Sequence, residues 1–223
     1  HTVSESPSRF STRNVDVAIA SSDNFGRMVA HSQVLISGSM DPSPGLIRFS
    51  EVVARDDFAL DHAALLIGAW DYPQRDIDTY REQLDAIAEH AAPQVARASS
   101  GIGRARAISD CLFERLGFCG NTDDYYDPRN SFLTDVLDRR TGIPISLSVL
   151  YLEVARRVGV LAQGVNFPGH FLVRVAIEDA WLFLDPFTGG RTLTPSDLEG
   201  LLKKTTTPDA VLEPSVIAAA TKR

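Results

Sequence analysis

The sequence is short of cysteine and of long apolar runs, and both absences limit what the protein can be. Its 223 residues include two cysteines, Cys111 and Cys119, which cannot make a four-ligand metal site alone. A reducing, cytoplasmic setting is the simplest one that fits so few thiols. No stretch approaches the roughly 18 consecutive apolar residues of a membrane-spanning helix, so we expect a soluble protein without membrane contacts.

An excess of positive charge is also missing. The formal net charge is −7, which argues against a general nucleic-acid surface or an anionic-membrane surface. The first residues, HTVSESPSRFSTRN, are polar and show no basic segment followed by an apolar one. We therefore expect no secretory signal.

The sequence does contain enough apolar residues, 44% of the chain, for one good core. We divide it into a loosely packed arm at 1–20, a helical subdomain at 21–120, a core at 121–205 and a tail at 206–223. Apolar residues at helical spacing predict helices in the subdomain, at 46–55, 61–70, 76–92 (closed by Pro93) and 103–118.

The second half changes from helical to strand periodicity. Pro144 suits the first position of a central helix, where its missing N–H costs nothing, and Gly159 ends that helix. Asn130-Ser131 and Thr194 are N-caps of two further helices. Period-two runs predict an antiparallel sheet of strands 162–167, 170–177 and 180–184. The expected fold class is α+β, a helical N-terminal half packed on a central helix and a small sheet.

His170 and Asp185 are the candidate catalytic residues with the clearest geometry. His170 opens one predicted strand and Asp185 closes the next, so a hairpin would bring them side by side. The carboxylate could then orient the imidazole, as nucleophilic hydrolases and acyltransferases require. The alternative is a structural histidine whose contact with the aspartate ties two strands together.

The order of these features resembles the transglutaminase-like superfamily, a branch of the papain-type cysteine hydrolases. Its pattern is matched at the helix end, at the histidine and at the aspartate, namely Arg156 to Gly159, His170 with Val173, and Trp181 before Asp185-Pro186. The stretch from Gly117 to Gly159, followed by NFPGHFLVR, resembles the bacterial SirB-type subfamily, whose relatives include a domain of some F-box proteins. The resemblance covers roughly residues 45–205 and implies a papain-type core.

The sequence departs from this family at the start of the central helix. Active members carry Gly-x-Cys there, and the resemblance places Gly142-Ile143-Pro144 in that position, so proline replaces the nucleophile. Ser146 is a candidate substitute, but at about 100° per residue it points roughly 200° away from position 144. Ser148 points within about 40° of that position, one turn deeper. We expect its hydroxyl to bond back to a helix carbonyl.

Other residues offer weaker candidates. Cys119 lies in a loop-like segment and could fold over the site as a nucleophile, although cysteine is also a common buried residue. The polar run that contains Tyr126, Arg129 and Asn130 is either a helix-capping loop or one wall of a binding cleft. Asn166 could donate an amide to an oxyanion, and Trp181 could form a substrate platform. For both, an exposed or core role is the alternative.

Two functions follow from these patterns. The first is a non-catalytic domain that binds a peptide or protein partner and needs no cofactor or metal. The second is a hydrolase or acyltransferase on amide or ester bonds, with a displaced Ser146 or Cys119 as nucleophile, His170 as base and Asp185 as orienter. We favour the first, because covalent chemistry cannot lose its nucleophile. A His–Asp pair could still activate water directly.

Overall fold

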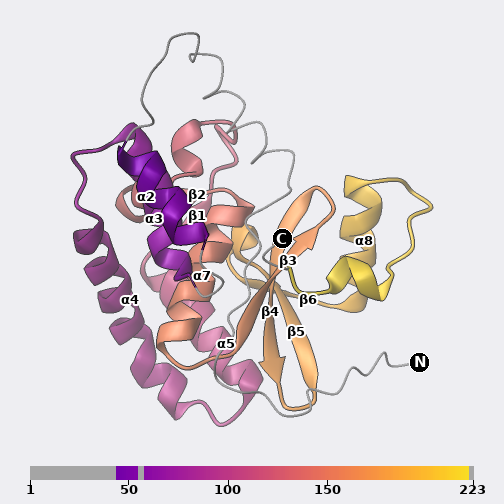
Figure 1. Cartoon of the computed structure of the whole chain (residues 1–223). Coiled ribbons are helices and arrows are strands. Elements are labelled where there is room, and N and C mark those ends of the chain that lie inside the picture. Colours follow the sequence, from indigo (N-terminus) through magenta and orange to yellow (C-terminus); the bar gives the residue numbers. More distant parts are fainter. Residues whose placement is uncertain (1–43, 55–57, 221–223) are drawn as a thin grey trace.

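The described residues, 44–54 and 58–220, form three layers in this computed structural model. Helices make the first layer, a four-stranded sheet the second, and helix α8 with the C-terminal segment the third (Figure 1). The predicted α+β class is confirmed. The arm expected at residues 1–20 lies outside the described residues. Within those residues, no helix is both long enough and apolar enough to cross a membrane.

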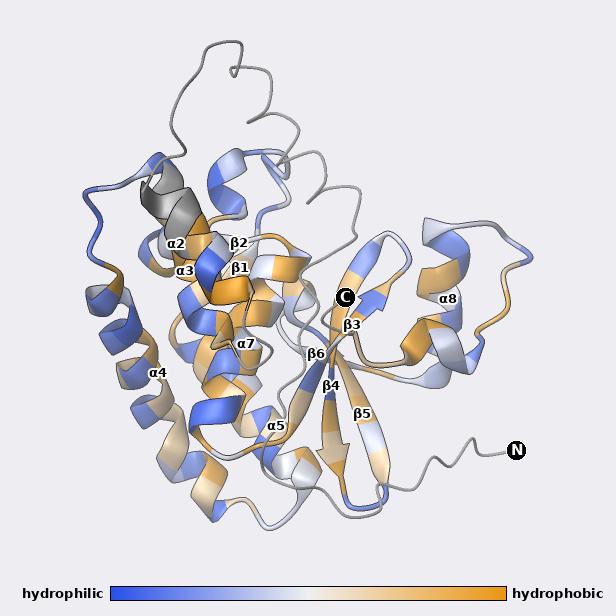
Figure 2. Cartoon of the chain, viewed as in Figure 1, coloured by the Kyte–Doolittle hydropathy of each residue, from blue (hydrophilic) through white to orange (hydrophobic). Residues whose placement is uncertain are grey.

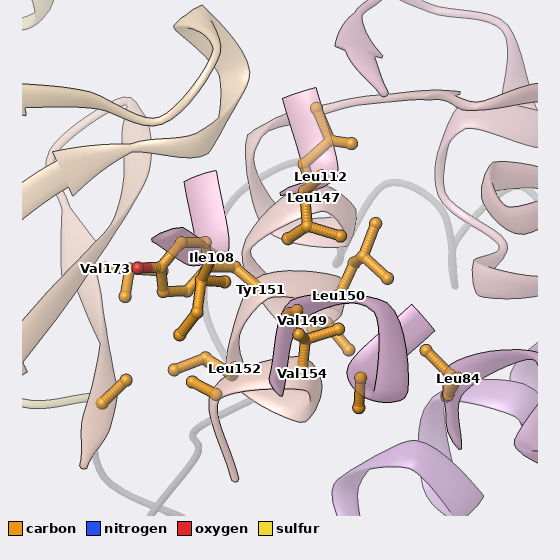
Figure 3. Packing of buried hydrophobic residues seen from close by; sticks show 14 of the residues in the cluster. Leu84, Ile108, Leu112, Leu147, Val149, Leu150, Tyr151, Leu152, Val154 and Val173 are labelled. Atoms are coloured by element: carbon orange, nitrogen blue, oxygen red, sulfur yellow. The ribbon is translucent and has the colours of Figure 1, made fainter. Parts of the chain in front are cut away.

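Helix α7, Pro144–Arg157, is the centre of the helical layer. Pro144 takes its first position and Gly159 follows its end with a φ of +73°, as predicted. Figure 3 shows Tyr151 of α7 beside Ile108 of α5 and Val173 of β4, and all three are fully buried. Burying one large apolar side chain contributes about 1.5–3 kcal/mol, so this contact joins the helices firmly to the sheet.

The sheet contains the three predicted strands and one that was not predicted. Its order is β3-β4-β5-β6 with antiparallel neighbours, and the strands are Ala162–Phe167, His170–Ile177, Ala180–Asp185 and Arg191–Leu193. Val173 and Leu184 belong to the core that contains α7, whereas Leu172 belongs to the cluster that contains α8. Alternate residues therefore cover opposite faces of the sheet.

The N-terminal helices differ from the prediction at two ends. They are α2 Pro44–Val53, α3 Leu60–Asp71, α4 Ile77–Arg97 and α5 Gly101–Ser109. The expected end at Pro93 is wrong, because α4 continues through this exposed proline and buries Val95 in the next turn. The helix expected at 103–118 is α5 followed by a π-helical turn, η1, at Asp110–Arg115. Figure 2 shows hydrophilic residues along much of α4 and hydrophobic ones around α7.

Short elements connect α5 to α7. Strand β1, Cys119–Gly120, pairs in parallel with β2, Thr141–Gly142, and between them lie the 3-10 turn η2, Pro128–Asn130, and helix α6, Leu133–Arg139. Asn130-Ser131 does not cap α6. The N-cap is Phe132, without a side-chain hydrogen bond. The Asn130 amide instead donates to the carbonyls of Asp124 and Tyr125 and so shapes the preceding loop.

The C-terminal part begins as predicted and then differs from an extended tail. The N-cap Thr194 opens helix α8, Pro195–Thr205, and forms a reciprocal capping pair with Asp197. Beyond it, the 3-10 turn η4, Pro214–Ile217, contacts β3. The N–H of Ala220 then donates to the carbonyl of Gly164 at 2.8 Å. The segment after α8 is therefore part of the third layer.

Candidate functional site

His170 and Asp185 meet where β4 begins and β5 ends. The register pairs Val173 with Leu184, which brings Asp185 toward the start of β4. His170 Nε2 lies 3.0 Å from Asp185 Oδ1, and the two side chains are 13% and 8% exposed. The ring N–H does not point closely enough at this oxygen to form a well-aligned hydrogen bond. The pair is at ion-pair distance, and the carboxylate lies where it can orient the ring.

Phe187 holds both members of this pair, and the sequence gave no reason to single it out. Its backbone N–H donates to Asp185 Oδ1 at 3.0 Å, while its ring meets the His170 ring edge-on at 6.2 Å between centroids. On its far side the ring packs against Gly120, where an added Cβ would lie 2.6 Å from the ring. Strand β1 therefore supports the candidate site through Phe187.

The hydroxyl of Ser146 is committed to the start of α7. Its Oγ accepts from the N–H of Ile143 at 3.0 Å and donates to the carbonyl of Asn130 at 2.6 Å. The side chain is buried, and neither contact involves His170. Within the described residues, the His170 side chain interacts with Asp185 and with the Phe187 ring, and no hydroxyl or thiol hydrogen-bonds to it.

Neither cysteine meets His170. Cys119 is exposed, with its Sγ 3.8 Å from Thr141 Oγ1. Neighbouring residues of a strand point to opposite sides, and Gly120 is the residue that faces Phe187, so Cys119 points away from it. Cys111 is buried in η1, and burial raises the pKa of its thiol. Its thiol therefore stays protonated and unreactive near neutral pH.

Ser148 differs from its expectation. Its side chain is fully buried, and its hydroxyl has no hydrogen-bond partner among the described residues, so the expected bond to a helix carbonyl is absent. A buried hydroxyl without a partner costs free energy, which makes this position a local defect in the packing of α7.

The candidate binding residues fall into separate places. Asn130 is fully buried, and its Oδ1 accepts from the Asn121 amide, so it organises the loop from inside. Arg129 pairs with Asp127 at 2.8 Å, and this hydrogen bond lowers the pKa of the Asp127 carboxyl. Tyr126 is 82% exposed. Only Tyr126 of these three presents its side chain freely to solvent.

Tyr126 is nevertheless linked to the His170 pair through a row of rings. Its ring lies edge-on to Tyr125 at 5.4 Å between centroids, and Tyr125 meets Phe187 in the same way at 5.8 Å. Edge-to-face contacts of this kind add about 0.5–1.5 kcal/mol each beyond the area they bury. The loop is therefore both a capping loop and a neighbour of the candidate site.

Asn166 and Trp181 do not join the His170 pair. Asn166 is exposed on β3, opposite Phe171 in the strand register. Trp181 pairs with Ala176, so it lies about 20 Å along the sheet from His170 at roughly 3.3 Å per residue. The Arg174 guanidinium stacks over its ring at 4.3 Å. Within residues 44–54 and 58–220, no group of histidine, cysteine, aspartate and glutamate could hold a metal ion.

Comparison with known proteins defines the family. The family model for the transglutaminase-like superfamily matches residues 78–223, well over half of the chain. The chain belongs to the transglutaminase-like superfamily. No solved structure matches it. His170 and Asp185 thus lie in a transglutaminase-like domain, on adjacent strands that pack against its central helix.

Curated relatives of this transglutaminase-like chain are similar over part of its length. A UPF0162 protein of Xylella fastidiosa is 46% identical over 135 residues, which are 60% of this chain and 48% of that protein. A UPF0162 protein of Pseudomonas aeruginosa is 36% identical over 164 residues, or 74% of this chain and 58% of that protein. Mouse F-box only protein 21 is 45% identical over 104 residues, 43% of this chain and 17% of that protein. The chain spans about half the length of the UPF0162 relatives it matches.

Proposed function

We propose that this chain is a non-catalytic domain that binds a peptide or protein partner, and that it is of the SirB type, with Pro144 where active relatives carry the nucleophilic cysteine. The observation that carries the proposal is the commitment of Ser146, the hydroxyl residue on the first turn of α7, to Asn130 and Ile143. Cys119 supports it, because this thiol contacts Thr141 and points away from Phe187. Without a nucleophile, the His170–Asp185 pair acts as a structural tie between strands.

The similarity to F-box only protein 21 lends the binding proposal limited support. That protein has a domain that is 45% identical to part of this chain, but the match covers 17% of its length. Its partners belong to the rest of that protein as much as to the shared domain. The similarity therefore names no partner for this chain.

Returning a thiol to position 144 tests the proposal. In a Cys119→Ser background, Pro144→Cys should be alkylated by iodoacetamide about 10-fold faster at neutral pH than the same variant with His170→Ala, because a nearby imidazolium lowers the pKa of a thiol. Ile145→Cys in the same background is the matched control, since it points about 100° away from position 144. Intact-mass spectrometry measures the rate.

The result separates two accounts of the site. If alkylation of Cys at 144 is accelerated by His170 and alkylation at 145 is not, the site keeps the geometry of a cysteine hydrolase and lacks only the thiol. If His170 has no influence at position 144, proline does not stand in the nucleophile's place and this part of the proposal is wrong.

A further inference from the structure

Residues near the C-terminus cover a surface directly beside the candidate site. Ala220 is 5% exposed and forms a small hydrophobic cluster with Phe171, and Ile145 packs against it. Ile145 follows Pro144 in α7, and Phe171 follows His170 in β4. We call the surface formed by Ile145, Gly164, Phe171 and Arg174 the tail-binding site.

The contact is made largely through backbone atoms at the edge of the sheet. β3 is the first strand in the sheet order, and the Ala220 N–H donates to the Gly164 carbonyl at 2.8 Å. Arg174 Nη1 donates to the Ile217 carbonyl at 3.1 Å, and Gln163 holds this arginine by accepting from its Nε at 3.0 Å. Exposed strand edges bind extended segments in this way, with main-chain bonds for affinity and small pockets for selectivity.

The size of the residue at the Ala220 position is restricted. Gly164 lacks a side chain, and a Cβ there would lie 2.8 Å from the Phe171 ring, so the strand edge is already closely packed. Since Ala220 is buried between this ring and Ile145, a larger side chain would have to displace one of them. The site therefore selects a small apolar residue.

An exposed linker connects the tail to the rest of the third layer. Residues 206–209 are exposed after the end of α8, and Val211 is 74% exposed. Few buried contacts cross this stretch, so the segment that follows can leave the sheet while α8 and the core stay folded.

We infer that the tail-binding site is a strand-edge site for an extended peptide with a small apolar residue, and that residues 214–220 occupy it in cis. This inference rests on the proposed binding function and names the chemistry of its ligand. A peptide in trans must displace the chain's own segment, so the segment regulates access to the surface beside His170.

The test uses the full chain and a fluorescein-labelled peptide of residues 212–223, LEPSVIAAATKR. The chain variant Ala220→Arg loosens the tail and should bind the peptide at least about 10-fold more tightly than the wild-type chain, measured by fluorescence anisotropy. The chain variant Val211→Arg, changed at an exposed position, should behave as wild type. A peptide that carries the Ala220→Trp change should bind at least about 10-fold more weakly.

Circular dichroism and thermal unfolding check that each variant is folded, and Ile217→Asp replaces Ala220→Arg if the latter is not. Equal peptide binding by the loosened and wild-type chains overturns the inference but leaves the proposed function standing. Equal binding of the alanine and tryptophan peptides also overturns it. Mass spectrometry of the bound peptide addresses the proposed function separately, because cleavage or modification that depends on His170 would refute the non-catalytic reading.

Discussion

Ser146 and Ser148 lie two positions apart in α7, and both are buried, yet their hydroxyls have different surroundings. Ser146 satisfies the Ile143 N–H and the Asn130 carbonyl, whereas Ser148 has no partner among the described residues. Their helical angles were predictable from the sequence. Their partners were not, because Asn130 reaches Ser146 from a loop 16 positions earlier.

We predict opposite outcomes for the two alanine variants. Ser146→Ala should lower the free energy of unfolding by about 1–3 kcal/mol, since it leaves a buried N–H and a buried carbonyl without a partner. Ser148→Ala should change it by less than about 0.5 kcal/mol or raise it, because an unsatisfied buried hydroxyl is removed. Urea unfolding measures both, and equal losses would contradict the assignment.

A second residue-scale prediction concerns the support beneath the His170 pair. Gly120→Ala should lower the free energy of unfolding by about 1–3 kcal/mol, because the new Cβ would lie 2.6 Å from the ring and the carbonyl oxygen of Phe187. Gly200→Ala is the control. It lies in α8 with nothing within 4 Å of an added Cβ, so alanine should raise stability by about 0.5–1 kcal/mol. Denaturant unfolding of both variants checks the contrast.

At the scale of elements, an ionic network ties the end of α7 to α3 and α4. Arg157 Nη2 lies 2.6 Å from Asp61 Oδ2 of α3, and its Nε lies 2.7 Å from Asp85 Oδ1 of α4. Arg157 also pairs with Glu153 one turn earlier. Asp61 is 1% exposed, so its charge depends on these partners. The family's Arg-x-x-Gly helix ending therefore has a structural role in this chain.

Breaking this network should be costly. We predict that Asp61→Asn lowers the free energy of unfolding by about 3–5 kcal/mol, because it leaves the Arg157 guanidinium in a largely buried place without its partner. Asp78→Asn is the matched control, since this exposed carboxylate meets Arg81 at the surface and should cost less than about 1 kcal/mol. Losses of similar size in the two variants would show that the network adds no more than a surface pair.

The same carboxylate gives a pH dependence with a defined sign. Burial raises the pKa of Asp61, but the hydrogen bond and charge of Arg157 outweigh it, so the pKa lies below the ordinary 3.8. The unfolded chain therefore binds this proton first as the pH falls. The stability that Asp61 contributes is complete above about pH 4 and is lost as the pH falls toward the folded-state pKa. Urea unfolding between pH 5 and pH 2.5 should show a shallower acid loss for Asp61→Asn than for wild type, and parallel curves would contradict this.

The strands and the central helix could be predicted because their signals are local. Period-two alternation marks His170–Ile177, and a proline and a glycine mark the ends of α7. Pro93 misled the prediction because burial of Val95 outweighs the lost hydrogen bond in α4. Strands β1 and β2 have two residues each and form only by pairing with each other. The Asp61–Arg157 contact joins residues 96 positions apart, which no local pattern reveals.

At the scale of the whole molecule, the transglutaminase-like chain keeps a scaffold that brings His170 and Asp185 together on one side of α7. One hydrophobic cluster runs from α3 and α4 through α7 to the sheet, so the expected helical subdomain and core share their interior. The central claim is that this scaffold now serves binding and that its His–Asp pair has no nucleophile to activate. That claim concerns the region shared with relatives about twice as long.

The most direct test is turnover by the folded full chain and its His170→Ala variant. Both are assayed at high protein concentration against p-nitrophenyl acetate and a panel of peptide p-nitroanilides, with circular dichroism to confirm the fold. We predict that the rates of the two chains agree within about twofold on every substrate, because removing a base that activates nothing changes no step. A rate that falls about 10-fold or more in His170→Ala would contradict the account and establish the chain as an enzyme.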